Sequence, residues 1–341
     1  MHRPTLRHSV TTALLALAAV CAHAASFDCK SAKTPTEKAI CGSPKLSALD
    51  ERLAADYERA LHVLSPAGAN RLRESQRSWL RFATAVCAPR KRVDHGDPPA
   101  SCLEVEFGRR LQQLAQAGVL LGPYVFNRID AYAVRRSNDG DDTGYSNGFV
   151  TQHVGYPAID MPTTAAAVAW NAERQQEPGS VDADDDTDND VEVTLGCVGA
   201  AFISVEKISS EYAHGTPHGV FDREKHNELL APKPRDMTAD DVFAEASGWE
   251  EKLPALFWNV YVSGNRQNEA RPALETAIRE SAADPASWLL TPAGLQISFG
   301  AYEAGCYACN PGPITVPWSV LKPMLASPDL AACKAPPAAK P

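Results

Sequence analysis

Six aspartates crowd one short stretch of the sequence, and alternate carboxylates of this kind can bind calcium. A calcium loop of the EF-hand type started at the first of them would place Thr187 where glycine is needed and Val193 where a bidentate glutamate belongs. The pattern therefore favours a solvated acidic loop over a calcium site. Such a loop would attract a basic protein and raise its rate of association. The six residues are Asp182, Asp184, Asp185, Asp186, Asp188 and Asp190.

Histidines gather in a second place, where His214, His218 and His226 lie close to Asp222 in sequence and offer ligand types suited to zinc. Glycine or proline at positions 215, 217 and 219 prevents a helix there. The spacing of four therefore does not bring the first two imidazoles together as it would in H-E-x-x-H. We predict a shaped loop here and no metal ligand.

Cys306 and Cys309 form the single C-x-x-C pair, a spacing found in redox sites and in zinc sites. A redox pair needs its first thiol at a helix N-terminus, where the helix dipole lowers the pKa of the thiol. The sequence Asn-Pro-Gly-Pro over 310–313 argues against a helix after the pair. An all-cysteine zinc site would need a second C-x-x-C. We therefore predict a structural disulfide turn.

Signatures of hydrolases are missing: the sequence has no G-x-S-x-G, P-loop or H-E-x-x-H, and no S-x-x-K with its partner motifs. Nucleophilic and metal-dependent hydrolysis thus have no candidate residue. We predict a protein without catalytic residues and without a cofactor.

The N-terminus reads as an export signal. Arg3 and Arg7 precede an apolar run over 10–21, which is shorter than the roughly 20 residues of a membrane span, and alanines at 22 and 24 give an A-x-A cleavage pattern. Residues 1–24 are therefore predicted to be a signal peptide. No later stretch has transmembrane length, so we expect a periplasmic or secreted protein.

An oxidising compartment favours disulfides over free thiols, and eight cysteines follow the signal. We expect the first four to pair among themselves and the last four likewise, with Cys333 tying the C-terminal tail to Cys197 or to the C-x-x-C turn. The eight are Cys29, Cys41, Cys87, Cys102, Cys197, Cys306, Cys309 and Cys333.

Length and charge divide the mature chain into two parts. Residues 25–120 carry 15 Lys and Arg against 11 Asp and Glu, a net charge of +4, whereas residues 121–341 carry 16 against 31, a net charge of −15. The strongly anionic part excludes nucleic acid as its partner and favours a cationic one. We predict domains over 25–120 and 121–328 and an Ala- and Pro-rich tail over 329–341.

The first domain is predicted to be helical. Thr34-Pro35-Thr36-Glu37 is a capping box with proline at the first helical position, and Gly42 suits a left-handed helix stop. Ser43-Pro44 and Ser65-Pro66 start a second and a third helix, each with apolar residues at spacings of three and four. A loop over 88–100 and a fourth helix from Leu103 to Leu114 complete the domain.

This segment resembles the N-terminal domain of LprI-like lysozyme inhibitors over about residues 26–117. The resemblance rests on Cys29, the helix start over 34–41, Leu49 to Leu53 with Tyr57, the stretch Gln76 to Phe82 leading to Cys87, and Cys102 through Leu114. It implies an exported, disulfide-stabilised helical module. Lysozyme binding belongs to some members of the family only.

Strands and helices mix in the second domain. Strand patterns cover Tyr124 to Val134, Phe149 to His153, Val191 to Leu195, Ala201 to Ile208 and Leu256 to Val262, and helix patterns cover Thr163 to Arg174, Met237 to Phe243, Pro272 to Ala283 and Trp318 to Leu325. Without a βαβ rhythm, this order predicts an α+β domain with a mainly antiparallel sheet.

The second domain resembles the C-terminal domain of the lysozyme-sensing anti-sigma factor RsiV over about residues 122–327. The matching stretches are Tyr156 to Ile159 with Trp170-Asn171, Tyr212 to Gly219, Met237 to Phe243, Leu295 to Phe299 with Tyr302-Glu303, and Gly312 to Leu325. Three departures are the C-x-x-C pair, the Asp-rich insert, and the lack of a transmembrane helix or sigma-binding segment before the domain. Anti-sigma activity is therefore not expected, whereas protein binding in the envelope is.

Together these observations predict an exported, non-enzymatic binding protein of lysozyme-inhibitor type. Its acidic domain would meet a cationic lysozyme-like protein, and the partner-binding candidates are the six aspartates together with Tyr302 and Tyr307. Two alternatives stay open: a structural protein associated with peptidoglycan, and, less favoured, a metal-dependent enzyme acting on cell-wall glycan.

Overall fold

The computed structural model describes residues 25–88, 99–137, 148–175, 186–231, 234–264 and 272–337. Its first part is helical, as predicted, and the helices begin where the prolines and their preceding serine or threonine place them. Thr34 and Glu37 form the reciprocal capping box, and Ser43 and Ser65 cap the next two helices. The helices are α1 (Pro35–Gly42), α2 (Pro44–Val63), α3 (Pro66–Val86) and α4 (Pro99–Leu114).

The predicted left-handed stop at Gly42 is wrong. Gly42 is the last residue of α1 and has no positive φ, and the chain leaves the helix at Ser43 in an extended conformation. Ser43 must be extended because it is also the N-cap of α2, where its hydroxyl accepts from the N–H of Leu46. One residue thus ends one helix and starts the next.

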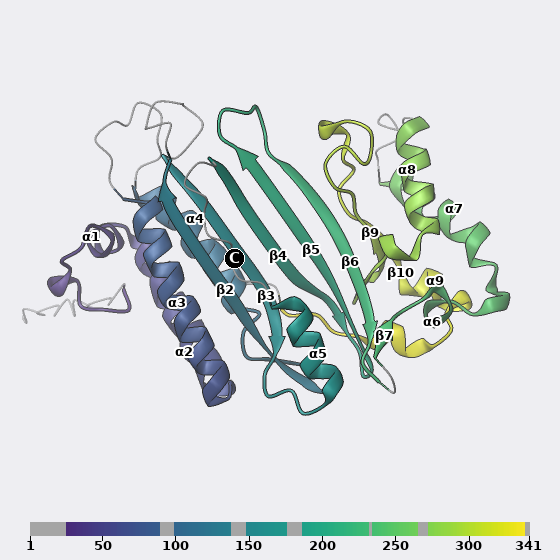
Figure 1. The fold of residues 1–341 in the computed structure, drawn as a ribbon, viewed down its shortest axis with the longest axis horizontal. Helices are drawn as coiled ribbons and strands as arrows, with labels where there is room; N and C mark the ends of the chain where they lie inside the picture. Colours follow the sequence, from purple (N-terminus) through teal and green to yellow (C-terminus); the bar gives the residue numbers. More distant parts are fainter. Residues whose placement is uncertain are drawn as a thin grey trace, which may run out of the picture.

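A seven-stranded sheet forms the centre of the molecule, with its strands in sequence order (Figure 1). All neighbours pair antiparallel except β3 and β4, which are parallel and are joined across α5 (Ala165–Arg174). The strands are β1 (Val119–Leu121), β2 (Tyr124–Arg136), β3 (Phe149–Ile159), β4 (Thr187–Val198), β5 (Phe202–Ala213), β6 (Val220–Leu229) and β7 (Arg235–Asp236). The mainly antiparallel α+β fold of the second part is therefore confirmed.

The helical part packs directly on this sheet. Because β1 covers only the first residues of β2, the rest of that edge is free for α3, which runs alongside it (Figure 1). The Ser78 hydroxyl accepts from the N–H of Tyr132 (3.2 Å) and donates to its carbonyl oxygen (3.3 Å). The Asn127 amide donates to the carbonyl of Gly68 (3.0 Å), and Asp160 accepts from the N–H and hydroxyl of Ser65.

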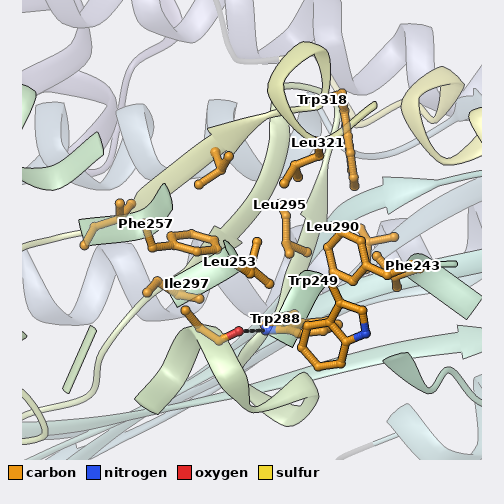
Figure 2. Packing of buried hydrophobic residues seen from close by; sticks show 14 of the residues in the cluster. Phe243, Trp249, Leu253, Phe257, Trp288, Leu290, Leu295, Ile297, Trp318 and Leu321 are labelled. Atoms are coloured by element: carbon orange, nitrogen blue, oxygen red, sulfur yellow. Dashed lines mark hydrogen bonds between the residues drawn. The ribbon is translucent and has the colours of Figure 1, made fainter. Parts of the chain in front are cut away.

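A second, smaller sheet and several helices cover the other end of the large sheet (Figure 1). The apolar core of this smaller sheet and its helices centres on Phe243, Trp249 and Trp288, whose ring centroids lie within 5.5 Å of one another (Figure 2). The Trp288 indole donates to the carbonyl of Ala282. The elements are α6 (Ala239–Val242), α7 (Trp249–Ser263), α8 (Pro272–Ala283), β8 (Leu289–Thr291), β9 (Gly294–Ile297), β10 (Ile314–Pro317) and α9 (Trp318–Leu321).

The predicted strand from Leu256 to Val262 is wrong, because these residues form the second half of α7. Their aromatic and β-branched side chains favour a strand, but Leu253, Phe257 and Tyr261 are buried at intervals of four, which is a helical spacing. Leu253 and Phe257 are seen in the core in Figure 2. Packing of that stripe into the core decides the conformation.

The described residues form four disulfides, and each joins two cysteines of the same part of the chain. Two lie in the helical part, one joins the end of β4 to the C-terminal tail, and one closes the C-x-x-C turn. Of the two attachments that the sequence left open for Cys333, the structure has the one to Cys197, beside a backbone bridge between Val198 and Lys334. The pairs are Cys29–Cys41, Cys87–Cys102, Cys197–Cys333 and Cys306–Cys309. Among the described residues, no helix is both long and apolar enough to cross a bilayer.

Candidate functional site

A trough of about 340 Å³, lined by charged and aromatic residues, crosses one face of the large sheet between α4 and the C-x-x-C turn. Since side chains alternate along a strand, neighbouring strands in this register contribute Tyr132, His153 and Asp190 to one row of the same face. The trough is lined on one side by Phe82 and Arg109 of the helical part and on the other by Phe221 and Tyr307.

Three of the residues singled out in the sequence meet in this trough: Asp188, Asp190 and Tyr307. Tyr302 lies beside them, 5.8 Å from Tyr307 between ring centroids. Asp186 instead pairs with Arg135 (3.0 Å) and accepts from the Ser137 hydroxyl (3.0 Å). The three remaining aspartates, Asp182, Asp184 and Asp185, lie outside the described residues.

Aromatic side chains form the wall on the side of the C-x-x-C turn. The Tyr307 ring stacks on His218 with centroids 4.0 Å apart, and the Tyr302 hydroxyl lies 3.1 Å from Nε2 of the same histidine. Tyr302 has φ +67°, a left-handed conformation that is uncommon for a residue with a bulky side chain. The turn therefore presents two partly exposed tyrosines around one imidazole.

The two aspartates of the floor are held in place but are still accessible. Asp188 accepts from the N–H (2.7 Å) and hydroxyl (2.9 Å) of Thr151 and lies 3.1 Å from Nε2 of His214. Asp190 lies 3.4 Å from Nδ1 of His153. Their side chains are 31% and 45% exposed, so each can accept a further hydrogen bond from a partner.

Beside the floor, on the same face of the sheet, lies a buried ionic network that joins α4 to three strands. Arg110 of α4 donates to Asp130 of β2 (2.8 Å), and both side chains are fully buried. Arg128 donates to the other oxygen of Asp130 (2.8 Å) and to Glu192 of β4 (2.6 Å). Burial alone would raise the pKa of Asp130, but Arg128, His153 and Arg110 together hold it well below its ordinary value. Asp130 is therefore a permanent anion.

Gly155 makes room for this network, because β3 passes directly beneath it. A Cβ atom at this position would lie 1.9 Å from Nη2 of Arg128 and 2.7 Å from Oδ1 of Asp130. Only a glycine lets the two side chains lie flat across the strand.

Asp130, His153 and Glu192 have ligand atoms within 4.8 Å of one another, which is close enough to consider a metal. The guanidinium of Arg128, however, already lies between the two carboxylates and donates to both. A metal ion there would displace that cation or stand against it, so the donor set fits an arginine rather than a metal.

His153 connects the network to the trough. Burial disfavours its charged form, but the hydrogen bond to Asp130 and the ion pair with Asp190 outweigh this and raise the pKa of His153 to about 9. The same contact lowers the pKa of Asp190 against the opposing effect of burial. At neutral pH the pair is thus an imidazolium beside a carboxylate.

The histidines considered as zinc ligands do not come together. His214 lies beside Asp188, His218 stacks on Tyr307, and His226 lies 3.6 Å from Glu224 on β6. Residues 214–219 form the connection between β5 and β6, in keeping with the predicted shaped loop.

Sequence reasoning missed the buried ionic network beside the trough. Arg110, Asp130, His153 and Glu192 come from four different elements, and their contacts depend on strand register. One signal was available: Arg128 and Asp130 are two charges inside a stretch that reads as a strand. Charges at core positions of a strand require partners.

Residues 29–118 match the model of a family described as "Lysozyme inhibitor LprI". No protein in the curated set matches the chain. A DUF3298-family protein from Bacteroides fragilis is similar in structure at 16% identity and a TM-score of 0.44, over 62% of this chain and 97% of that one. A DUF3298-family protein from Pseudomonas aeruginosa shows 13% identity and a TM-score of 0.39, over 61% and 96%.

Proposed function

We propose that this chain is an exported, non-enzymatic binding protein of lysozyme-inhibitor type, and that it binds a cationic protein at the trough. The family match over residues 29–118 supports the inhibitor type. The single observation that carries the location is the meeting of Asp188, Asp190 and Tyr307 in one recess, lined by both parts of the chain.

The chemistry of the trough suits a lysine or arginine side chain of a partner. Asp190 is ionised at neutral pH and half exposed, so it can pair with a cation from the partner while His153 holds it from below. Tyr307 and Phe221 offer aromatic surface beside it, which favours a cation or its aliphatic stem. The net charge of −15 over residues 121–341 would steer such a partner toward this face.

The decisive experiment measures lysozyme binding and lysozyme activity with the purified mature protein at low and at physiological salt. We expect binding that weakens with salt and inhibition of cell-wall hydrolysis. Tyr307→Ala and Asp190→Asn should each weaken binding about 10-fold, since central aromatic and charged contacts contribute on the order of 1–2 kcal/mol or more.

Asp329→Asn is the matched control, because Asp329 is an exposed aspartate of the same acidic part and lies in the short 3₁₀ helix Pro328–Ala332, away from the trough lining. It should leave the affinity within about 2-fold. Absence of any lysozyme binding at low salt would refute the proposal. Equal losses of lysozyme affinity in the control and in the trough variants would refute the trough as the binding site.

The alternatives give different results in the same preparation. A structural, peptidoglycan-associated protein would sediment with purified sacculi and leave lysozyme activity unchanged. A metal-dependent enzyme on cell-wall glycan would release sugar fragments on its own and lose that activity in chelator. The resemblance of residues 122–327 to RsiV supports protein binding in the envelope and stays part of this proposal, as does the periplasmic or secreted location.

A further inference from the structure

The disulfide of the C-x-x-C turn lies at the surface beside the trough. It joins cysteines three positions apart, of which Cys306 is exposed and Cys309 is half-buried. The Cys197–Cys333 pair differs, because both of its cysteines are buried in the core. An exposed disulfide can be attacked by an incoming thiolate, and labile and regulatory disulfides are of this kind.

The turn lacks the features of a pair that catalyses thiol exchange. Cys306 precedes a 3₁₀ helix of only three residues, Tyr307–Cys309, which has too few aligned peptide dipoles to stabilise a thiolate strongly. The next element along the chain is the strand β10 and not a helix. The pair therefore suits the substrate of a thiol oxidoreductase better than the oxidoreductase itself.

The disulfide holds one aromatic residue of the trough wall, because Tyr307 lies between the two cysteines. Its ring is 37% exposed, lines the trough and stacks on His218. The N–H of Cys309 also donates to the carbonyl of Cys306 (2.8 Å) across the same ring of residues. Opening the disulfide leaves Tyr307 with noncovalent contacts, so its ring becomes less fixed.

On both sides of the turn the chain is anchored by contacts that do not pass through the disulfide. Before it, the N–H of Ala301 donates to the carbonyl of Phe221 on β6 (2.7 Å). After it, the Asn310 amide donates to the carbonyls of Phe299 (2.9 Å) and Gly300 (3.3 Å). Reduction should therefore loosen the residues between these anchors and leave the fold intact.

We propose that Cys306–Cys309 is a thiol–disulfide exchange site for a dithiol oxidoreductase, and that its reduction weakens binding at the trough. A thiolate of the oxidoreductase attacks Sγ of Cys306, the bond to Cys309 breaks, and Cys309 leaves as a thiolate that takes up a proton. The second thiol of the oxidoreductase loses its proton and attacks the mixed disulfide, and Cys306 leaves and is protonated. Two electrons and two protons thus pass to the turn, and the oxidoreductase becomes a disulfide. The exchange site is independent of lysozyme, whereas its effect on binding rests on the proposed function.

The first experiment tests the exchange site on the folded mature protein, without denaturant. Reduced thioredoxin is the probe and dithiothreitol the small-molecule comparison, and free thiols are blocked with iodoacetamide and mapped by peptide mass spectrometry. We expect both cysteines of the turn to be labelled at thiol concentrations that leave Cys197–Cys333 intact. Amide hydrogen exchange should become faster over 302–309 and stay unchanged in β6. A turn that is unlabelled until Cys197–Cys333 also opens would overturn the exchange site.

The second experiment measures lysozyme affinity at low salt, after the reductant has been removed so that it does not reach the lysozyme. The reduced protein and the double variant Cys306→Ser/Cys309→Ser should both bind about 3- to 10-fold more weakly, because the Tyr307 side chain must be ordered on binding. Reoxidation should restore the affinity of the wild type and leave that of the variant unchanged.

Cys29→Ser/Cys41→Ser is the matched control. It removes a disulfide with the same pattern of one exposed and one half-buried cysteine, in the helical part and outside the trough lining. Its affinity should stay within about 2-fold of the wild type. Wild-type affinity in the Cys306/Cys309 variant, or equal losses in the two double variants, would overturn the effect on binding. If lysozyme binds neither form while the turn is still reduced and loosened, the proposed function fails and the exchange site stands.

Discussion

At the scale of single residues, protonation of His153 makes the stability of the fold depend on pH. Its imidazole lies 3.2 Å from Asp130 and 3.4 Å from Asp190, so the charged form is favoured in the folded state only. The pKa of about 9 lies above the ordinary value of 6.5. A raised pKa means that the folded state binds the proton more tightly than the unfolded state does. The contacts of protonated His153 with Asp130 and Asp190 therefore stabilise the fold fully below pH 6.5. This stabilisation is lost as the pH rises through 9.

We therefore predict that the free energy of unfolding falls between pH 6.5 and 9. The difference between the two pKa values corresponds to about 3 kcal/mol at 1.36 kcal/mol for each pKa unit. Urea unfolding at pH 6, 7.5 and 9 measures it. His153→Gln should flatten this pH dependence, whereas His62→Gln, a change at an exposed histidine of α2, should keep it. The mechanism is wrong if the His153 variant retains the wild-type slope.

Side-chain contacts between residues that are close in the sequence could be predicted from the sequence alone. The capping box at Thr34 and Glu37 follows from contacts within one turn of helix, and the sequence alone shows it. The position of Asp188 and Tyr307 in one recess does not follow from the sequence, because β4 and the C-x-x-C turn are more than 100 positions apart and come together only through the order of the strands. The acidic and aromatic residues were identified, but their common location was not.

At the scale of elements, α3 acts as the cover of a sheet edge. A free strand edge offers unpaired N–H and C=O groups to other chains, and proteins blunt such edges with a helix or a loop. Here Ser78 satisfies both backbone groups of Tyr132, and Ser75 accepts from the N–H of Asp130 (3.3 Å). Hydroxyls are suited to this role because each can donate and accept at once.

Ser78→Ala should destabilise the protein by about 1–3 kcal/mol, because it leaves the N–H and carbonyl of Tyr132 partly buried without partners. The midpoint of urea unfolding measures the loss. Thr84→Ala tests the same loss of a hydroxyl at an exposed position of α3 and should stay within about 0.5 kcal/mol of the wild type. Similar midpoints for the two variants would show that the serine does not protect the edge.

Elements with strong local signals were predictable, and those decided by packing were not. The helix starts at Pro44 and Pro66 and the strands around Val191 and Phe202 follow from proline, serine and alternation. The strand expected over Leu256 to Val262 is a helix, since a mostly apolar segment satisfies either pattern and its neighbours in the core select one. β6 was not predicted for a different reason: its sequence is rich in charged residues, and its strand conformation comes from pairing with β5.

At the scale of the whole molecule, the proposed division into 25–120 and 121–328 falls inside β1, which contains residue 120. The contacts that cross the proposed division include buried charges as well as apolar groups. Arg110 is the central one, since its guanidinium donates to Asp130 across the division and to Gln76, Ser75 and Gln113 on its own side. We propose that the two regions are separate modules in sequence and one cooperative unit in stability.

Arg110→Leu tests this proposal, because its cost should depend on Asp130 of the other region. In the wild-type chain it should cost about 3 kcal/mol, since Asp130 loses one of its buried cations. In an Asp130→Asn background the same change should cost less by about 1 kcal/mol or more, because the charge that Arg110 pairs with is already gone. Denaturant unfolding followed by circular dichroism compares the two backgrounds, and Arg109→Leu, a neighbouring change at a half-exposed arginine, should be nearly neutral in both. Equal destabilisation in the two backgrounds would show that Arg110 serves the helical region alone and that the two regions are energetically independent.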